Sequence, residues 1–393
     1  MHARIFYAHT WKRAWPFCCG SGACLTNDRL LRSSLSGIFR RSFPLHSPRY
    51  ARQTIAEICS LRAALATAII GQTGSIASAA LVVAGLTYEK AQESRDRGRY
   101  PAPGRFVDIG GRRLHLFVEG NAPGPTVVIE QGIGSPSVVW WPIQASIAKF
   151  ARVCTYDRAG FLWSDPVEKD RSLDDMIADL HAVLKNGEVP SPYILVGHSM
   201  GGLLVRRFAR AYPDLVAGIV LVDSPDELVV FRDAIRPFYT QGLRMQRILG
   251  VLARLGLLRL LGRRIPMLML PDDPVGYALC ATPQHARAAA DDMQAMLNAS
   301  QAMQQPDAPG ALGNRPLLLL EHGIAFPPIA AAMEEGWSAS QRRLTHLSTN
   351  SELLTADKCG HLIHVEAPGL VVESVRRVYA AACNRTQLKS AAA

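Results

Sequence analysis

Residues 193–202 read Tyr-Ile-Leu-Val-Gly-His-Ser-Met-Gly-Gly. The apolar start of this stretch is typical of a buried strand, and residues 200–212 fit a helix. A Gly-x-Ser-x-Gly sequence between a strand and a helix predicts a sharp turn. Such a turn lifts its serine above the edge of a sheet and needs small residues beside it. We therefore predict that Ser199 is a nucleophile.

Strands and helices alternate along the chain around this turn. Residues 105–109 and 113–119 predict a hairpin, because Gly110 and Gly111 lie between two short strand patterns. The other predicted strands are 126–130, 152–156, 193–197, 218–222, 316–320 and 353–356. The predicted helices are 139–150, 172–184, 200–212, 334–347 and a last one from residue 370. Continuous apolar strands separated by helices predict a mostly parallel sheet with helices on both faces.

An insertion of residues 224–314 interrupts this alternation and is helical by pattern. Residues 243–261 within it carry Leu, Ile and Val almost all round, which is typical of a buried segment. We predict a helical cap over the site, and four arginines in the same stretch leave a membrane-touching cap as an alternative. The predicted core is then residues 100–223 and 315–382, and the Pro- and Gly-rich residues 100–104 mark its start.

A serine needs a base to become a nucleophile, and in a strand-turn-helix site of this kind the base comes last in the chain. His361 follows the last predicted strand and a flexible Gly360, so we predict that it is the base, with His364 as its competitor. A carboxylate must then orient the imidazole. Asp223 ends a predicted strand and is the predicted acid, and Glu321 is the alternative.

Backbone N–H groups must stabilise the oxyanion that forms during acyl transfer. We predict that Met200, which follows the nucleophile, supplies one and that Ile133, in the loop after strand 126–130, supplies the other. That loop fails as a dinucleotide-binding fingerprint because its third glycine is absent. Asp157 and Arg158 end another strand at the same rim, and we predict that they brace the loops.

These motifs resemble the α/β-hydrolase superfamily over roughly residues 100–382. The residues that carry the resemblance are 130–134 (Glu-Gln-Gly-Ile-Gly), 156–160 (Tyr-Asp-Arg-Ala-Gly), 197–202 and 360–364. The similarity is greatest to a branch with an N-terminal membrane helix and a GHSxGG nucleophile elbow. It implies the α/β-hydrolase fold, a Ser-His-acid hydrolase, and a helical cap inserted between strands 6 and 7. Three departures are Gln131 in place of the usual His, Leu162 in place of a common Gly, and a missing acid after the seventh strand.

Composition excludes several other classes of protein. The 393 residues are 48% hydrophobic and 19% charged, which excludes a disordered chain. Eight cysteines without a CxxC pair do not make a disulfide framework. The net charge of +10 is concentrated in a basic tail, residues 1–62, with ten basic and two acidic side chains. The remainder carries a net charge of only +2, so we predict no nucleic-acid partner.

Residues 63–88 contain no charged side chain and predict a single transmembrane helix, although polar residues interrupt the run. A buried helix of the fold and a cleaved signal-type segment are the alternatives. Bases on the N-terminal side predict that the tail stays inside and that the catalytic domain lies on the non-cytoplasmic side of the membrane. The tail itself is interpreted as solvated, with a transit-like presequence or a mis-set start as alternatives.

Together these observations predict a membrane-anchored serine hydrolase that cleaves a hydrophobic carboxylic ester through an acyl-enzyme, without a metal or cofactor. A metal is not expected because the histidine pair at 361 and 364 lacks a third ligand at a suitable spacing. Aminopeptidase, amidase and acyltransferase activities stay open, since a fold does not fix a substrate. A catalytically silent binding protein is the alternative of another class, and the presence of both Ser199 and His361 argues against it.

Overall fold

The computed structural model describes residues 76–388 except 263–270, 272 and 327–330. Its centre is an eight-stranded sheet in the order β1-β2-β4-β3-β5-β6-β7-β8. The strands are β1 (Arg105–Asp108), β2 (Arg113–Glu119), β3 (Thr126–Glu130), β4 (Val153–Tyr156), β5 (Tyr193–His198), β6 (Val216–Val222), β7 (Leu317–His322) and β8 (Ser351–Ala356). The pairs β1–β2 and β2–β4 are antiparallel, and the other neighbours are parallel.

The register of the central strands brings their carboxyl ends to one edge. His198 of β5 lies opposite Val222 of β6, and Val222 lies opposite Leu320 of β7. The residues that follow β5 and β6, Ser199 and Asp223, therefore leave the sheet side by side. Strand β7 runs two residues further than the sequence predicts, so that it ends at His322.

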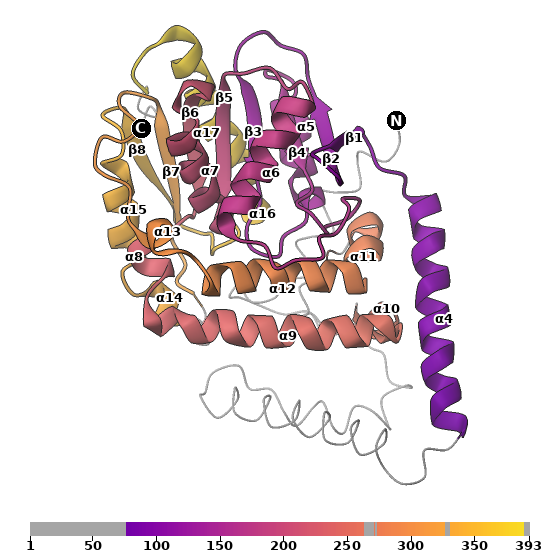
Figure 1. The fold of residues 1–393 in the computed structure, drawn as a ribbon. Helices are drawn as coiled ribbons and strands as arrows, with labels where there is room; N and C mark the ends of the chain where they lie inside the picture. Colours follow the sequence, from indigo (N-terminus) through magenta and orange to yellow (C-terminus); the bar gives the residue numbers. More distant parts are fainter. Residues whose placement is uncertain (1–75, 263–270, 272, 327–330, 389–393) are drawn as a thin grey trace, which may run out of the picture.

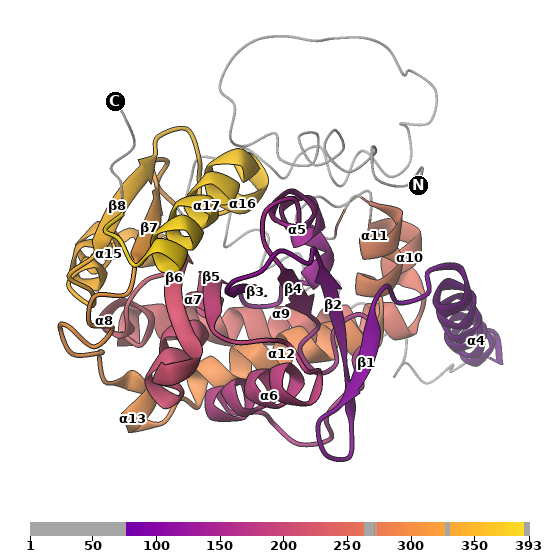
Figure 2. The same cartoon turned by 90° about the horizontal axis from the view of Figure 1, so that it is seen from above.

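Helices cover both faces of the sheet (Figures 1 and 2). One apolar cluster joins the sheet to α6, α7 and α15, and a second joins its other face to α5, α16 and α17. These helices are α5 (Trp141–Ile147), α6 (Leu173–Asn186), α7 (Met200–Ala211), α15 (Trp337–Thr345), α16 (Ile363–Glu366) and α17 (Pro368–Asn384). The predicted fold class, a mostly parallel sheet with helices on both faces, is confirmed.

Local sequence signals explain where several helices begin and end. Ser172 accepts a hydrogen bond from the N–H of Asp175 at 3.0 Å, and the Asp175 carboxylate accepts one from the N–H of Ser172 at 2.9 Å, so α6 begins with a capping box. The predicted helix 334–347 corresponds to the shorter α15, because Gly336, with a φ of +78°, separates it from α14 (Ala331–Glu334). The predicted helix 139–150 begins as a 3₁₀ turn (Ser137–Trp140) before α5.

The inserted segment forms a layer of helices along one edge of the sheet, which we call the cap (Figure 1). Its helices are α8 (Glu227–Val230), α9 (Arg236–Arg254), α10 (Leu257–Leu261), α11 (Pro274–Cys280), α12 (Pro283–Leu297) and α13 (Gln301–Gln304). The expectation that residues 243–261 are buried on every face is wrong. Leu243, Leu249 and Leu258 are buried, whereas Val251 and Leu260 are exposed, because α9 and α10 present only one side to the rest of the cap.

Helix α4 (Ile76–Arg99) precedes the core and packs against the cap (Figure 1). Arg259 of α10 donates from its Nε to Glu89 of α4 at 2.7 Å and also pairs with Asp96. A Cβ on Gly85 would lie 2.7 Å from the carbonyl oxygen of Leu255, so glycine allows the two helices to touch. Residues 63–75 of the predicted transmembrane helix lie outside the described residues. In the part of the chain that the structure describes, no helix is both long enough and apolar enough to cross a membrane.

Candidate active site

Ser199 sits in a tight turn between β5 and α7, with φ of 52° and ψ of −121°. That conformation is costly for a residue with a side chain and occurs mainly where surrounding packing enforces it. The flanking glycines explain how the turn closes. A Cβ on Gly197 would lie 2.6 Å from the Gly201 carbonyl oxygen, and one on Gly202 would lie 2.0 Å from the Ser224 hydroxyl. Ser199 therefore lies in a sharp strand-to-helix turn that only small flanking residues allow.

Asp223 and His361 are in direct contact. Nδ1 of His361 lies 2.6 Å from Oδ2 of Asp223, and the carboxylate is completely buried. Burial alone would raise the pKa of Asp223, but hydrogen bonds from His322 and His361 outweigh it and hold that pKa well below its usual value. An ionised Asp223 accepts the Nδ1–H of His361, which leaves Nε2 of that ring as the proton acceptor.

His198 connects His361 to the elbow. Burial, together with the neighbouring His361, lowers the pKa of His198 to about 3. The ring therefore stays neutral, and its Nε2–H donates to the carbonyl oxygen of His361 at 2.9 Å. Among the described residues no hydrogen bond joins the Ser199 hydroxyl to His361. Such contacts are commonly loose in a site without substrate and tighten when the substrate binds.

The two competing residues of the sequence analysis lie elsewhere. The Glu321 carboxylate accepts a hydrogen bond from the Thr355 hydroxyl of β8 at 2.9 Å and makes no contact with His361. His364 stacks on Trp140, with ring centroids 4.5 Å apart and planes 3° from parallel. Its burial lowers its pKa far below the usual value, so this ring is a neutral part of the core. The structure thus brings Asp223 and His361 together, and not their alternatives.

The loop after β3 lies against Ser199, as the predicted oxyanion loop must. A Cβ on Gly132 would lie 3.4 Å from the Ser199 Cβ and 2.7 Å from Nδ1 of His198, so the position has no room for a side chain. Met200 is the first residue of α7, and its N–H therefore has no acceptor within the helix. Within the described residues, the N–H of Ile133 also has no backbone acceptor outside the regular elements.

Arg158 fixes the loop after β3 through hydrogen bonds. It donates to Glu130 at 2.7 Å, to the Gly132 carbonyl oxygen at 2.7 Å and to Asp292 of the cap at 2.8 Å. Asp292 in turn accepts the N–H of Gly134 at 2.9 Å. The predicted bracing by Arg158 therefore has a direct structural counterpart, and the cap takes part in it. Asp157 bonds His115 of β2 at 2.8 Å instead.

Two departures from the family pattern have simple structural counterparts. Leu162 occupies a position with a φ of +40°, which is why glycine is common there. Gln131 turns its side-chain amide to the carbonyl oxygen of Ile129 at 3.3 Å, so it stabilises its own strand end. The third departure, the missing acid after the seventh strand, is explained by His322, which occupies that strand end and contacts Asp223.

Three residues around Asp223 were not predicted from the sequence. His322 places its Nδ1 2.7 Å from Oδ2 of Asp223, and Trp337 donates from its Nε1 to Oδ1 at 2.9 Å. Glu334 lies 3.2 Å from Nε2 of His322. The sequence signal for them is limited to the polar residues that follow the predicted strand 316–320. Residues at the carboxyl ends of parallel strands share one edge of the sheet. Helix α15, which carries Trp337, has no sequence signal that relates it to the site.

Asp223, His322 and His361 offer donor atoms within 4.8 Å of one another. The two ring nitrogens involved are both Nδ1, and each already donates to Asp223. A cation would have to displace those protons, so we assign these atoms to hydrogen bonds rather than to metal ligation. The remaining ring nitrogen of His322 faces Glu334, which leaves no open coordination position on that side.

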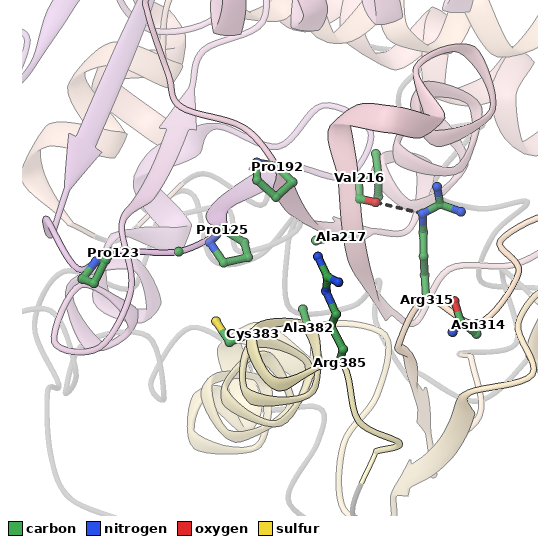
Figure 3. A pocket seen from close by; sticks show the side chains of 11 residues that line it. Pro123, Pro125, Pro192, Val216, Ala217, Asn314, Arg315, Ala382, Cys383 and Arg385 are labelled. Carbon is green, nitrogen blue, oxygen red and sulfur yellow. Dashed lines mark hydrogen bonds between the residues drawn. The ribbon is translucent and has the colours of Figure 1, made fainter.

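A separate cavity of about 810 Å³ opens at the opposite edge of the sheet (Figure 3). It lies beside the starts of β3, β5 and β6, and Cys383, Arg315 and Arg385 line part of it. Arg315 donates to the Val216 carbonyl oxygen at 2.8 Å. None of the predicted site residues line this cavity, which therefore has no part in the chemistry at Ser199.

Comparisons with known proteins support this architecture. A family model described as the alpha/beta hydrolase fold matches residues 125–266. The uncharacterized protein YqjL of Bacillus subtilis is 25% identical over 283 residues, which are 70% of this chain and 92% of that protein. The enol-lactonase of Burkholderia xenovorans superposes with a TM-score of 0.51 at 17% identity, over 70% of this chain and 99% of the lactonase.

A shorter match relates the chain to an esterase. The pimeloyl-[acyl-carrier protein] methyl ester esterase of Shewanella woodyi is 36% identical over 109 residues. The match covers 28% of this chain and 40% of the esterase, so the chain spans less than half the length of this relative.

Proposed function

Because the chain has the α/β-hydrolase fold, we propose that it is a serine hydrolase that cleaves carboxylic esters through an acyl-enzyme intermediate. The observation that carries the proposal is the 2.6 Å contact between His361 and the buried Asp223, one strand away from the strained turn that holds Ser199. In this assignment Ser199 is the nucleophile, His361 the general base and Asp223 the orienting acid.

The proposed reaction begins when the Ser199 hydroxyl loses its proton to Nε2 of His361 while its oxygen bonds to the ester carbonyl carbon. The carbonyl π electrons move to oxygen, and the N–H groups of Ile133 and Met200 stabilise that oxyanion. Collapse of the tetrahedral intermediate breaks the bond to the alcohol, which takes the proton from His361. Water repeats the sequence on the acyl-enzyme and releases the acid. Asp223 stabilises the imidazolium in both halves without accepting its proton.

Two observations support ester substrates. A relative over part of the chain is named as a methyl ester esterase, and a structural neighbour is named as an enol-lactonase. Both names denote enzymes that act on carboxylic esters, since a lactone is a cyclic ester. The nucleophile position holds a serine, which suits acyl transfer, whereas an epoxide hydrolase or dehalogenase needs a carboxylate at that point.

We further propose that residues 63–88 anchor the chain in a membrane. The uncharged run that begins at residue 63 continues into α4, where Leu81 is 75% exposed and Val83 is 61% exposed. Apolar side chains gathered on one exposed helix indicate a contact surface, and a lipid bilayer fits the uncharged sequence around them. Carbonate at high pH should then leave the full-length protein in the membrane fraction, and detergent should release it. Release by carbonate would leave only a peripheral association.

A fluorophosphonate probe and a panel of p-nitrophenyl esters test the proposed chemistry. The probe should label the wild-type protein and not Ser199→Ala, and the same variant should lose on the order of 10⁶ in kcat. Ser338→Ala, which changes an exposed serine of α15, is the matched control and should behave as wild type. A matching panel of amides separates esterase from amidase activity. Labelling of Ser199→Ala at the wild-type rate would exclude Ser199 as the nucleophile.

A further inference from the structure

His322 lies between two carboxylates. Its Nδ1 is 2.7 Å from Oδ2 of Asp223, and its Nε2 is 3.2 Å from Oε2 of Glu334. The side chain of His322 is almost entirely buried. Glu334 also accepts the N–H of Phe326 at 2.8 Å, which fixes the carboxylate against the ring. The titratable groups that face His322 are therefore Asp223 at the end of β6, Glu334 of α14 and His361, while the rings of Phe326 and Trp337 pack around it.

The proton count of this arrangement differs from that of an ordinary triad. A neutral imidazole has one N–H and one bare nitrogen, so it can donate to only one of two carboxylates. The bare nitrogen would then present its lone pair to the lone pairs of the other carboxylate. This repulsive contact is costly, because the His322 ring is shielded from water and its bare nitrogen finds no other donor there. The cluster must therefore hold one additional proton, either on His322 or on Glu334.

The surroundings of His322 favour this residue as the one that carries the additional proton. Burial alone would lower the pKa of His322, but the hydrogen bond and charge of Asp223, together with the charge of Glu334, raise it above its usual value. Glu334 is about one-third exposed and keeps partial access to water, which stabilises its ionised form. A charged His322 also donates from both ring nitrogens, so that both contacts are attractive.

We propose that His322 rests as an imidazolium between Asp223 and Glu334 and acts as a positioning residue for the triad. This inference rests on the proposed function of Ser199, His361 and Asp223. His322 and Trp337 fix the Asp223 carboxylate from one side, so that His361 meets it in a single orientation. The positive charge of His322 also opposes protonation of His361, which bonds the same carboxylate oxygen.

The pH profile of His322→Gln tests the charge. Glutamine keeps a donor toward Asp223 and removes the positive charge, so two carboxylates then act on His361. We expect the acid limb of the pH dependence of kcat/KM to move up by about one pH unit. Glu321→Gln, at the neighbouring residue outside the cluster, is the matched control and should keep the wild-type profile. A merely structural role of His322 would lower activity at every pH without moving the limb, and that result would overturn the proposal.

Nitrogen NMR of histidine-labelled protein gives a test that does not depend on turnover. The histidine whose signals disappear in His322→Gln should show both ring nitrogens protonated at neutral pH in the full-length wild-type protein. In Glu334→Gln, the amide can donate to Nε2, so the same histidine should change to the neutral form with its proton on Nδ1. A neutral His322 in the wild type would place the additional proton on Glu334 and refute the inference.

The proposed function and the role of His322 can fail separately. Labelling of Ser199 by fluorophosphonate in His322→Gln shows that the triad still works, whatever the pH profile does. An unchanged limb with labelling intact refutes the role of His322 alone. Labelling of Ser199→Ala refutes the proposed function itself, and the NMR measurement still reports the charge of His322 in that case.

Discussion

Asp223→Asn is the substitution from which the structure predicts the most specific effect. The carboxylate accepts from Nδ1 of His361 at 2.6 Å and Nδ1 of His322 at 2.7 Å on Oδ2. On Oδ1 it accepts from Nε1 of Trp337 at 2.9 Å and the backbone N–H of His322 at 3.1 Å. Asparagine keeps the size of the side chain and offers only one oxygen. Its amide nitrogen must therefore face donors on one side or the other.

Either orientation has a defined cost. If the amide nitrogen replaces Oδ2, it faces both imidazoles. His361 can then accept a hydrogen bond at Nδ1 only if its own proton moves to Nε2. With Nε2 protonated, His361 no longer acts as a base. If it replaces Oδ1, two buried donors lose their acceptor, at about 1–3 kcal/mol each in the free energy of unfolding. Loss of the correct tautomer costs about 10⁴ in kcat, or roughly 5 kcal/mol of transition-state stabilisation.

The assay is hydrolysis of a p-nitrophenyl ester by purified full-length protein, with thermal unfolding measured on the same samples. Asp223→Asn should lose about 10⁴ in kcat while it still shows a cooperative unfolding transition. Glu321→Gln should lose less than about tenfold, because Glu321 contacts only Thr355 among the described side chains. A folded Asp223→Asn that keeps more than a tenth of wild-type kcat, or a larger loss in Glu321→Gln, would refute the assignment of the acid.

Three further predictions follow from the packing around the site. Gly132→Ala should lower kcat by about tenfold to a hundredfold, since its Cβ would meet His198, while Gly369→Ala, with open space around it, should match wild type in the same ester assay. Burial lowers the pKa of His285 to about 4, so between roughly pH 6.5 and 4 the unfolded chain binds a proton that the folded chain does not. The free energy of unfolding should therefore fall by about 1.4 kcal/mol for each pH unit in this range. His285→Gln should reduce that slope in acid unfolding curves. Arg158→Met should cost about 3–5 kcal/mol in chemical denaturation, because it removes the charge that Glu130 and Asp292 share, and kcat should fall with it.

Much of the fold follows from local sequence alone. The buried strand runs, the capping box at Ser172 and the glycines around Ser199 each act over a few residues, so their patterns predict the structure directly. The register of β5 and β6 then places Ser199 and Asp223 together, which is why the acid could be predicted from the end of its strand. These predictions depend on periodicity and on the shared edge of parallel strands.

The part of the site that sequence did not predict depends on tertiary packing. The apolar run predicts a strand that ends at Leu320, whereas parallel pairing with β8 extends β7 to His322. Trp337 and Asp292 come from helices whose position over the site is set by how the cap and α15 pack. No local pattern determines that position, so the contacts of these side chains emerge only in the folded chain.

The contact between α4 and the cap holds together two segments that are far apart in the sequence. Arg259 and Glu89 are separated by 170 residues, and both side chains are almost fully buried where they meet. Moving α4 away from the cap would separate these two charged side chains and expose both of them. A rigid displacement of the cap must therefore carry α4 along. The helix that leads into the core is therefore coupled to the cap, and a restraint on α4 also restrains the cap.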